Sequence, residues 1–327
     1  MPSTARSFKF STVGGPDVLT WGEEALAAPA EGQVQIAQEA IGVNYIDIYH
    51  RAGTYPLPLP SGVGVEGAGT ITAIGANVGG FKVGDRVVYA GGPPGAYATA
   101  RNVPAARVLK LPDDISSLDA ASLIFKGLTV EYLIRRCFKV SAGDTVLFHA
   151  AAGGIGLIAC QWLKALGATV IGTMSSDEKA ALARANGCDH TIIYSRENFV
   201  ERVKEITGGA GVPVVYDSVG ATTFAGSLDC LRPRGMLVSF GTASGPTPPL
   251  DLGALGAKGS LFVTRASIAH YTAKREELEA GGAAVFEMIR KGALKAVGLK
   301  TYALAEAVQA HRDLEGRTST GSLVLLP

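Results

Sequence analysis

The pattern of apolar and polar residues changes once along this chain, near residue 124. Before it, short alternating runs such as 33–40 and 69–74 are broken by Gly and Pro, which predicts irregular antiparallel β structure with few helices. From about 124 to 264, short apolar runs alternate with amphipathic segments of helix length. That rhythm predicts βαβ units on a doubly wound parallel sheet of the α/β class.

Individual elements can be placed within this second region. Gly167 and Gly187 stand where helices should end. The expected strands are 145–149, 169–173, 191–194, 212–216 and 236–240, and the expected helices are 155–166, 177–185, 199–207 and 223–231.

The last part of the chain is too short to fold alone. It contains two helix-like segments, 275–291 and 304–315, and a terminal β-like run, 322–326. We therefore expect two domains, one made of 1–123 and 265–327 and the other of 124–264, as the length of 327 residues also suggests.

Composition narrows the function classes. With 47% hydrophobic and 18% charged residues the chain should fold, and a net charge of +1 makes nucleic acid an unlikely main partner. The four cysteines form no C-x-x-C pair, and the chain starts without an apolar leader, so we expect neither a zinc cluster nor secretion but a cytoplasmic protein. The most apolar stretch, 146–162, is interrupted by His149, Gln161 and glycines, so we expect no membrane segment.

A glycine-rich loop follows the first strand of the parallel region. It reads Ala151-x-Gly153-x-x-Gly156, a dinucleotide fingerprint with Ala at the first glycine position. Glycine lets the backbone approach a pyrophosphate, and the following helix offers free N–H groups. An ordinary tight turn is the alternative, but the strand before and the helix after favour a dinucleotide.

The end of the second strand indicates which dinucleotide. No carboxylate follows directly; Ser175, Ser176 and then Lys179 do, a set able to receive a 2′-phosphate, so NADPH is favoured over NADH. Alternatively, Ser176 caps the next helix and Lys179 lies on its solvated face. Asp177 and Glu178 fit the first turn of that helix.

Motifs in the first region resemble the medium-chain dehydrogenase/reductase superfamily. They are Gly64-Val-Glu-Gly-Ala-Gly69, Gly75, Val78 and Val83-Gly-Asp-Arg-Val87. Compared with the zinc alcohol dehydrogenases of that superfamily, Val65 replaces a His ligand and Asn44 a Cys ligand. The remaining residues could not complete a tetrahedral zinc shell, so the resemblance implies an enzyme without a metal.

Further motifs resemble NADPH quinone oxidoreductases of the zeta-crystallin type, nearly end to end. They are Ala40-Ile-Gly-Val-Asn44, Lys126-Gly-Leu-Thr129, His149-Ala-Ala-Ala-Gly-Gly-Ile-Gly156, Tyr216-Asp-Ser-Val-Gly220 and Ser239-Phe-Gly241. The resemblance implies a GroES-like, mainly antiparallel β catalytic domain beside a Rossmann domain. It implies catalytic or substrate-contacting roles for Asn44, Tyr49, Tyr55, Lys126 and Thr129, and cofactor binding by Asn44, Thr129, Gly153, Gly154, Ile155, Gly156, Ser175, Lys179, Tyr194, Ser218, Phe240, Gly241 and Arg317.

The implied reaction asks little of the protein, because the cofactor carries the electron chemistry. Negative charge on a quinone oxygen could be stabilised by the Asn44 amide, by the Tyr49 or Tyr55 phenol, or by water, so we expect no single indispensable side chain. Asn44 and Asp47 could instead cap a turn, and both tyrosines could be half-buried packing residues.

Other readings remain open. One is an NADPH-dependent reductase of enone or alkenal double bonds, and another is a cofactor-binding structural or RNA-binding protein. We expect His149 to be a satisfied interior residue, the other four histidines to lie at the surface, and Trp21 and Trp162 to lie in the core. The apolar segment 261–264, after the last expected strand of the parallel sheet, could pair across a two-fold axis, and similar proteins are homodimers.

Overall fold

The computed structural model describes residues 3–316 and 320–327. They form two compact units, described separately below. Unit 1 comprises Met1–Leu128, Thr272–Arg290 and Lys295–Pro327, and unit 2 comprises Thr129–Tyr271 and Lys291–Leu294. Within the described residues, no helix is long and apolar enough to cross a membrane.

Unit 1 is built on two sheets whose strand pairs are antiparallel except for β15 with β16. A three-stranded sheet has the order β2 (Thr20–Leu26), β1 (Ser3–Phe10), β4 (Ser61–Gly62). A seven-stranded sheet has the order β15 (Lys300–Ala303), β16 (Leu323–Leu326), β3 (Gln33–Val43), β5 (Glu66–Ile74), β6 (Arg86–Ala90), β8 (Val108–Lys110), with β7 (Ala100–Pro104) also paired to β3.

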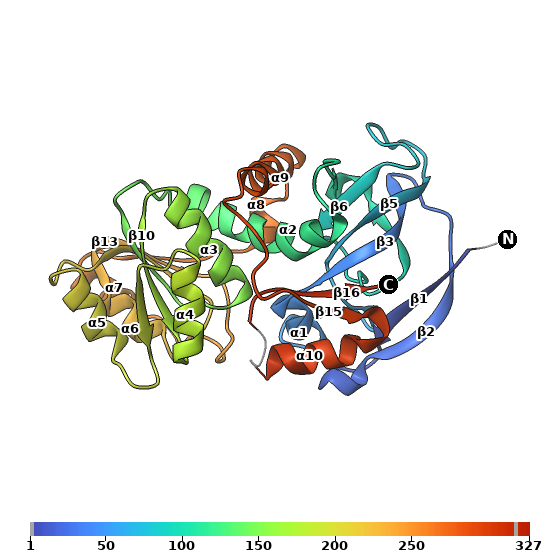
Figure 1. Cartoon of the computed structure of the whole chain (residues 1–327). Helices are drawn as coiled ribbons and strands as arrows, with labels where there is room; N and C mark the ends of the chain where they lie inside the picture. Colours follow the sequence, from blue (N-terminus) through green and yellow to red (C-terminus); the bar gives the residue numbers. More distant parts are fainter. Residues whose placement is uncertain (1–2, 317–319) are drawn as a thin grey trace. The chain divides into compact units, whose positions relative to one another are not determined.

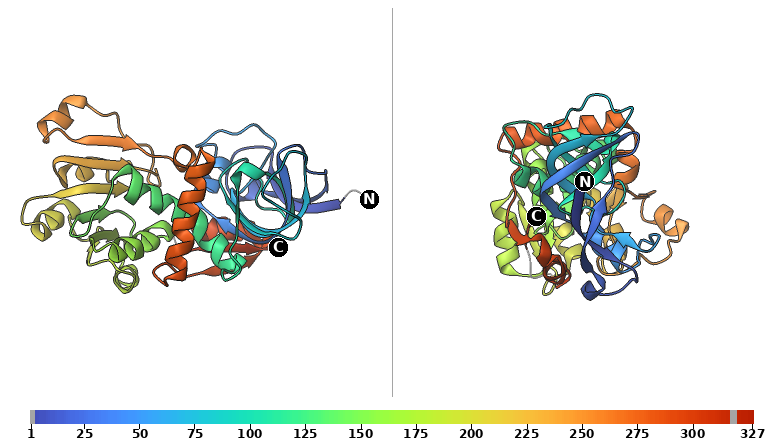
Figure 2. Two further views of the ribbon diagram at one scale, coloured as in Figure 1. Left: turned by 90° about the horizontal axis from the view of Figure 1, so that it is seen from above. Right: turned by 90° about the vertical axis from the view of Figure 1, so that its right-hand side faces the viewer.

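The helical elements of unit 1 are few, as the sequence predicts, and the strongly curved strands dominate the right-hand view of Figure 2. They are η1 (Pro16–Val18), α1 (Tyr45–Arg51), η2 (Ala105–Arg107), α9 (Arg275–Arg290), η4 (Leu304–Glu306) and α10 (Ala307–Glu315). The segment expected as one helix at 304–315 is thus a 3₁₀ turn followed by an α-helix. Alternating inward positions of the strands form the core, which includes Phe10, Ile36, Ile41 and Ile71.

Unit 2 is a six-stranded parallel sheet with the order β11 (His190–Ile193), β10 (Thr169–Met174), β9 (Thr145–Phe148), β12 (Val212–Asp217), β13 (Leu231–Ser239), β14 (Phe262–Arg265). Helices α3 (Gly154–Ala165), α4 (Asp177–Ala185), α5 (Phe199–Ile206) and α6 (Phe224–Asp229) pack on its strands (Figure 1). This order, with a reversal between β9 and β12, is that of the Rossmann fold. The fold class expected from the sequence is confirmed.

Helices α3, α4, α5 and α6 begin and end within two residues of the expected positions. The sequence did not predict helices α7 (Leu252–Ala257) and α8 (Ile268–Tyr271) or the π-helical turn at Leu133–Cys137. Helix α2 (Ser117–Tyr132) begins in unit 1 and ends in unit 2. Gly167 and Gly187 follow α3 and α4 with positive φ angles, as expected for helix stops.

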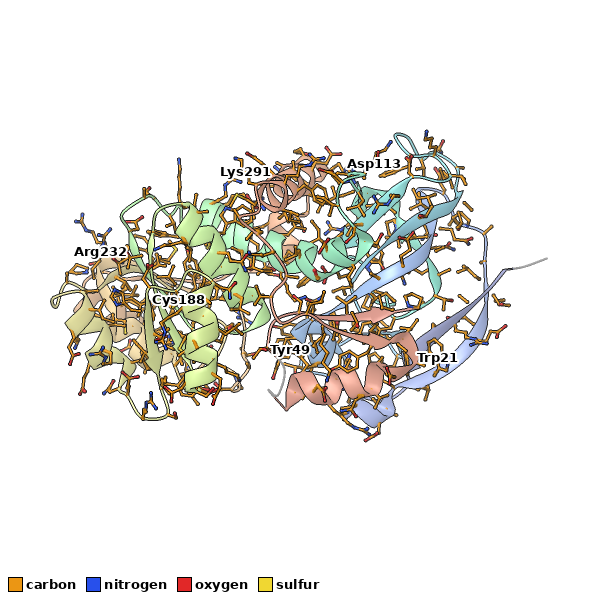
Figure 3. The ribbon with its side chains drawn as sticks, viewed as in Figure 1. Trp21, Tyr49, Asp113, Cys188, Arg232 and Lys291 are labelled. Carbon is orange, nitrogen blue, oxygen red and sulfur yellow. The ribbon has the colours of Figure 1, made fainter. Side chains whose placement is uncertain are left out.

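Two expectations about strands and one about the core are wrong. Strand β13 begins at Leu231 rather than 236, because the Pro-containing segment before Met236 pairs with β12 through a register shift. The segment expected to follow the parallel sheet is its sixth strand, β14. Trp21 (Figure 3) is 38% exposed on β2, with its ring centroid 4.9 Å from that of Phe8, whereas Trp162 is buried as expected.

Candidate functional site

Most predicted cofactor-binding residues meet at one edge of the unit 2 sheet. Because all strands are parallel, their carboxyl ends lie along the same edge. The residues that follow these ends are Gly153, Gly154, Ile155 and Gly156 after β9, Ser175 and Lys179 after β10, Tyr194 after β11, Ser218 after β12, and Phe240 and Gly241 after β13. The structure therefore gathers residues that are far apart in the sequence.

The glycine loop is tighter than the sequence suggests. Ala150, one residue before the expected first glycine position, has the left-handed φ of 55°, so the turn is made there. A Cβ atom on Gly156 would lie 2.4 Å from the Ala150 carbonyl oxygen and 2.6 Å from Ala151 Cα. Gly156 is thus required for the helix to pack against the loop, while Gly153 is exposed and caps α3 without a side-chain hydrogen bond.

A chain of buried side chains holds this loop. Ser227 Oγ donates to Asp217 Oδ2 at 2.9 Å and lies 3.0 Å from His149 Nε2, so it accepts from that nitrogen. His149 Nδ1 then accepts from Thr173 Oγ1 at 2.9 Å, and Thr173 Oγ1 lies 3.4 Å from the Ala150 amide nitrogen. Burial lowers the pKa of His149, which keeps the ring neutral. His149 is a satisfied interior histidine, as expected.

The other end of the same edge carries the residues predicted to bind an adenosine phosphate. Ser176 accepts a hydrogen bond from the Lys179 amide and caps α4, so the structural reading of Ser176 is confirmed. Lys179 is partly buried, and Tyr194 is 48% exposed. The Tyr194 amide donates to the Met174 carbonyl at 3.1 Å, which joins the loops after β10 and β11.

Unit 1 contains a second polar cluster, formed by Asn44, Glu66 and Lys126. Asn44 Nδ2 donates to Glu66 Oε2 at 2.7 Å, the Phe125 amide donates to Glu66 Oε1 at 2.7 Å, and Lys126 Nζ lies 3.8 Å from Glu66 Oε2. All three side chains are buried. Burial raises the pKa of Glu66, and the Lys126 ammonium opposes that shift.

Gly42 makes room for this cluster. A Cβ atom there would lie 2.0 Å from Glu66 Oε2 and 2.5 Å from the Ala121 carbonyl oxygen. The sequence motif that ends at Asn44 therefore has two parts: a glycine that admits the Glu66 carboxylate and an amide that binds it. Lys126 Nζ has no hydrogen-bond partner among the described residues, although it is buried.

Asp47 extends the cluster into a longer network. Asp47 Oδ2 accepts hydrogen bonds from the backbone amide of Asn44 at 2.9 Å and from the Tyr97 hydroxyl at 3.0 Å. Arg51 Nη1 can only donate to His311 Nδ1, at 3.1 Å, so His311 Nε2 carries the proton that it donates to the Tyr97 oxygen at 3.0 Å. Arg51 also pairs with Glu315.

Burial governs the charges of this network. It raises the pKa of Asp47 to about 7 and lowers that of His311 to about 3. The expectation that His311 lies at the surface is wrong, because α10 packs it against the Tyr97 ring with centroids 5.5 Å apart. Asp47 and Asn44 do cap helix α1, as the alternative reading had it.

The remaining predicted residues are placed as follows. Tyr49 on α1 (Figure 3) packs on Tyr55 with ring centroids 5.0 Å apart, and both are half-buried. Thr129 is buried in α2. Ser218 touches Gly241 so closely that a Cβ atom on the glycine would lie 2.5 Å from the Ser218 carbonyl oxygen. Arg317 lies outside the described residues.

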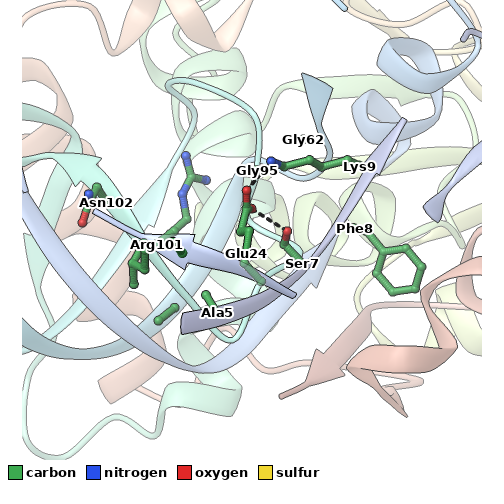
Figure 4. Close-up of a pocket in the computed structure, with 13 residues that line it drawn as sticks. Ala5, Ser7, Phe8, Lys9, Glu24, Gly62, Gly95, Arg101 and Asn102 are labelled. Atoms are coloured by element: carbon green, nitrogen blue, oxygen red, sulfur yellow. Dashed lines mark hydrogen bonds and ion pairs between the residues drawn. The ribbon is translucent and has the colours of Figure 1, made fainter. Parts of the chain in front are cut away.

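A cavity of about 250 Å³ lies elsewhere in unit 1 (Figure 4). Its wall includes the Lys9–Glu24 ion pair, Ser7 and Arg101, and it contains none of the predicted site residues. We therefore do not place the site there.

Reasoning from the sequence missed the residues that position others: Glu66 as the centre of a cluster, Tyr97, His311 and Asp217. The Glu66 signal was present, since a carboxylate between glycines in a buried strand needs partners. Tyr97 and His311 gave no local signal.

Comparison with known proteins identifies the family of the chain. Residues 30–113 match the alcohol dehydrogenase GroES-like domain family and residues 154–280 the zinc-binding dehydrogenase family. A quinone oxidoreductase of Pseudomonas aeruginosa is 50% identical over 324 residues, covering 99% of this chain and 100% of that protein. A 2-haloacrylate reductase of a Burkholderia species is 48% identical and covers 96% of both chains.

Solved structures indicate the same family. The crystal structure of Escherichia coli quinone oxidoreductase complexed with NADPH is 47% identical and has a TM-score of 0.97, covering 99% of this chain and 100% of that one. The resemblance expected from the motifs is thereby confirmed. The chain belongs to the quinone oxidoreductase family of the medium-chain dehydrogenase/reductase superfamily.

Proposed function

We propose that this protein is an NADPH-dependent quinone reductase. The observation that carries the proposal is the carboxyl edge of the unit 2 sheet, where helix α3 opens at Gly153 without a side-chain cap and Ser175, Lys179 and Tyr194 follow the neighbouring strands. The relative crystallised with NADPH supports it.

The residues fit the cofactor. Gly153 is exposed and leaves the first amides of α3 without a side-chain cap, as a diphosphate requires. Gly154, Ile155 and Gly156, in the same first turn of α3, would bind the same diphosphate. Ser175, Lys179 and Tyr194 would bind the adenosine phosphate through hydroxyls and a positive charge. Ser218, Phe240, Gly241, Thr129 and Arg317 are proposed to complete cofactor binding.

The groups of unit 1 would act on the acceptor. When bound, NADPH supplies the reducing equivalents. Lys126 has buried N–H groups without hydrogen-bond partners in the described chain, and Asn44 Nδ2 commits one hydrogen to Glu66, leaving its second for a substrate oxygen. Tyr49 and Tyr55 are proposed as further donors. Together these groups would stabilise negative charge as it develops on oxygen.

No step in this scheme needs a metal. Both carboxylate oxygens of Glu66 already accept hydrogen bonds, from Asn44 and from the Phe125 amide, and the Lys126 ammonium balances the charge. Val65 and Asn44 replace ligands of the zinc alcohol dehydrogenases. We therefore propose a zinc-independent enzyme.

A second candidate is reduction of an activated double bond. The 2-haloacrylate reductase among the relatives favours it, because the same site would stabilise the enolate oxygen. Steady-state comparison of 1,4-benzoquinone with an enone under NADPH separates the two. A higher kcat/KM for the enone would replace the first proposal with the second.

We also propose a homodimer formed through strand β14. It is an edge strand of the parallel sheet. Phe262 on this strand is 56% exposed, and Leu252 on α7 is 76% exposed. Phe262→Lys should convert a dimer to a monomer, as measured by light scattering, and a wild-type monomer would refute the proposal.

The GroES-like domain is proposed to span 1–123 and 265–327 and the Rossmann domain 124–264. A cytoplasmic location fits four free cysteines.

The main test is a fluorescence titration with NADPH and NADH, followed by turnover on a panel of quinones. NADPH should bind more tightly than NADH. Lys179→Glu should weaken the binding of NADPH and leave that of NADH unchanged, because charge reversal repels the 2′-phosphate. Lys164→Glu, on the exposed Lys164–Asp189 pair, is the control. Failure of the wild type to bind either nucleotide would overturn the proposal.

A further inference from the structure

An exposed ion pair stands beside the proposed adenosine-phosphate residues. Arg196 Nη1 donates to Asp177 Oδ2 at 2.8 Å and Nη2 donates to Asp177 Oδ1 at 2.6 Å, a bidentate pair. Asp177 is the first residue of α4, directly after the capping Ser176. It is the carboxylate nearest in sequence to the end of β10, where an acid typically selects NADH.

The loops that carry this pair are joined at several points. The Tyr194 amide donates to the Met174 carbonyl at 3.1 Å, and Ser195 Oγ donates to the Ser175 carbonyl at 3.3 Å. Arg196 follows directly, so its guanidinium reaches Asp177 across the same two loops that carry Ser175 and Tyr194. The pair therefore borders the proposed binding site of the adenosine phosphate.

We propose that Arg196 is a specificity-determining residue that masks the Asp177 carboxylate and so admits a 2′-phosphorylated dinucleotide. The inference rests on the proposed binding of NADPH and adds a residue to its phosphate site. Without Arg196, the unmasked carboxylate would repel a dianionic phosphate and accept hydrogen bonds from the ribose hydroxyls of NADH.

The surrounding charges agree with this role. Asp177 and Glu178 place two carboxylates in the exposed first turn of α4, and Lys179 follows on the same turn. Glu197, next to Arg196, pairs with Arg202, and its charge acts on Arg196 less strongly than that of Asp177 does. Both side chains of the masking pair are more than half exposed, so the chain does not depend on the pair for folding.

A double-mutant cycle tests the masking. Dissociation constants of NADPH, NADH, adenosine 2′,5′-bisphosphate and ADP are measured by calorimetry for the wild type, Arg196→Ala, Asp177→Asn and the double variant. Arg196→Ala should weaken the binding of NADPH and of the bisphosphate about tenfold, while the affinity for NADH and ADP should stay the same or rise. The double variant should recover most of the affinity for the phosphorylated ligands.

The control is Lys164→Ala, which removes an exposed cation of unit 2 that is paired with Asp189 and not with either residue of the masking pair. Equal weakening of all four ligands in Arg196→Ala, or an unchanged affinity for NADPH, overturns the proposal. So does a double variant that stays as weak as Arg196→Ala, because masking would then not be the cause. Failure of the wild type to bind NADPH would instead overturn the proposed function.

Discussion

The two units each contain a buried polar network, and the networks differ in how completely they are satisfied. In unit 2, the side-chain nitrogens and oxygens of Asp217, Ser227, His149 and Thr173 all have hydrogen-bond partners. In unit 1, Asp47 Oδ1 and Lys126 Nζ are buried and have none among the described residues. The first network is closed, and the second leaves two buried polar atoms without hydrogen bonds within the described chain.

The difference separates positioning from chemistry. A closed network costs little and fixes the segments that it connects, here the loops after β9 and β12 and the end of strand β10. An unsatisfied buried polar group costs about 1–3 kcal/mol, so two of them in one cluster need a reason. Binding of a substrate oxygen by Lys126, as proposed, supplies one. Four sets of variants test whether the two networks differ in this way.

The largest effect should come from breaking the closed network. Asp217→Ala leaves the hydroxyls of Thr223 and Ser227 and two backbone amides without their acceptor, so the free energy of unfolding should fall by at least about 3 kcal/mol. Urea unfolding measures it. The control is Asp229→Ala, which removes an exposed partner of Lys258 and should cost less than about 1 kcal/mol. Equal losses in both variants would contradict a closed network.

The next effect should come from the open cluster. Lys126→Met removes the buried ammonium, and kcat/KM for quinones should fall about 10- to 100-fold. This loss is smaller than that expected on removing the only donor to a developing oxyanion, because other donors are proposed. The NADPH dissociation constant should change less than kcat/KM does. Lys110→Met removes an exposed lysine of unit 1 and serves as the control. Unchanged turnover in Lys126→Met would remove Lys126 from the site.

The third effect is a pH dependence carried by Asp47. Its pKa of about 7 in the folded protein lies above that of an unfolded chain, so the native state holds the proton more tightly and stability is lost as pH rises toward 7. Asp47→Asn should abolish this loss, which can be at most about 1.4 kcal/mol per pH unit.

Urea unfolding of the wild type and Asp47→Asn between pH 5 and 8 measures that loss. Asp114→Asn is the control, because Arg290 holds the pKa of Asp114 below its usual value and no change is expected in that range. Parallel stability curves for the wild type and Asp47→Asn would show that Asp47 keeps its charge throughout.

The smallest effect should come from the tyrosines. Tyr49→Phe and Tyr55→Phe each keep the ring packing and remove one of several donors, so kcat should fall by a few-fold at most. Stopped-flow absorbance of NADPH oxidation measures it. Loss of all turnover in either variant, with NADPH still bound, would show that this tyrosine is indispensable.

Sequence reasoning worked where the signals are local. The alternation of apolar runs and helices in unit 2, with Gly167 and Gly187 as stops, predicted the elements to within a few residues. It failed at β13, where Pro233 interrupts a strand that nevertheless pairs with β12, and at β14, which sheet pairing alone defines. A strand exists only through its partners, and short or irregular runs do not show them.

Local patterns in the sequence were enough to predict the fold class, the glycine loop and the motif residues of both units, because periodicity and the backbone freedom of glycine act over a few neighbouring residues. The contacts of Glu66 with Asn44 and Lys126, and of His311 with Tyr97, 214 positions away, arise only in the folded chain. Such contacts depend on strand register and helix packing. A buried polar residue is indistinguishable from an exposed one until the chain has folded around it.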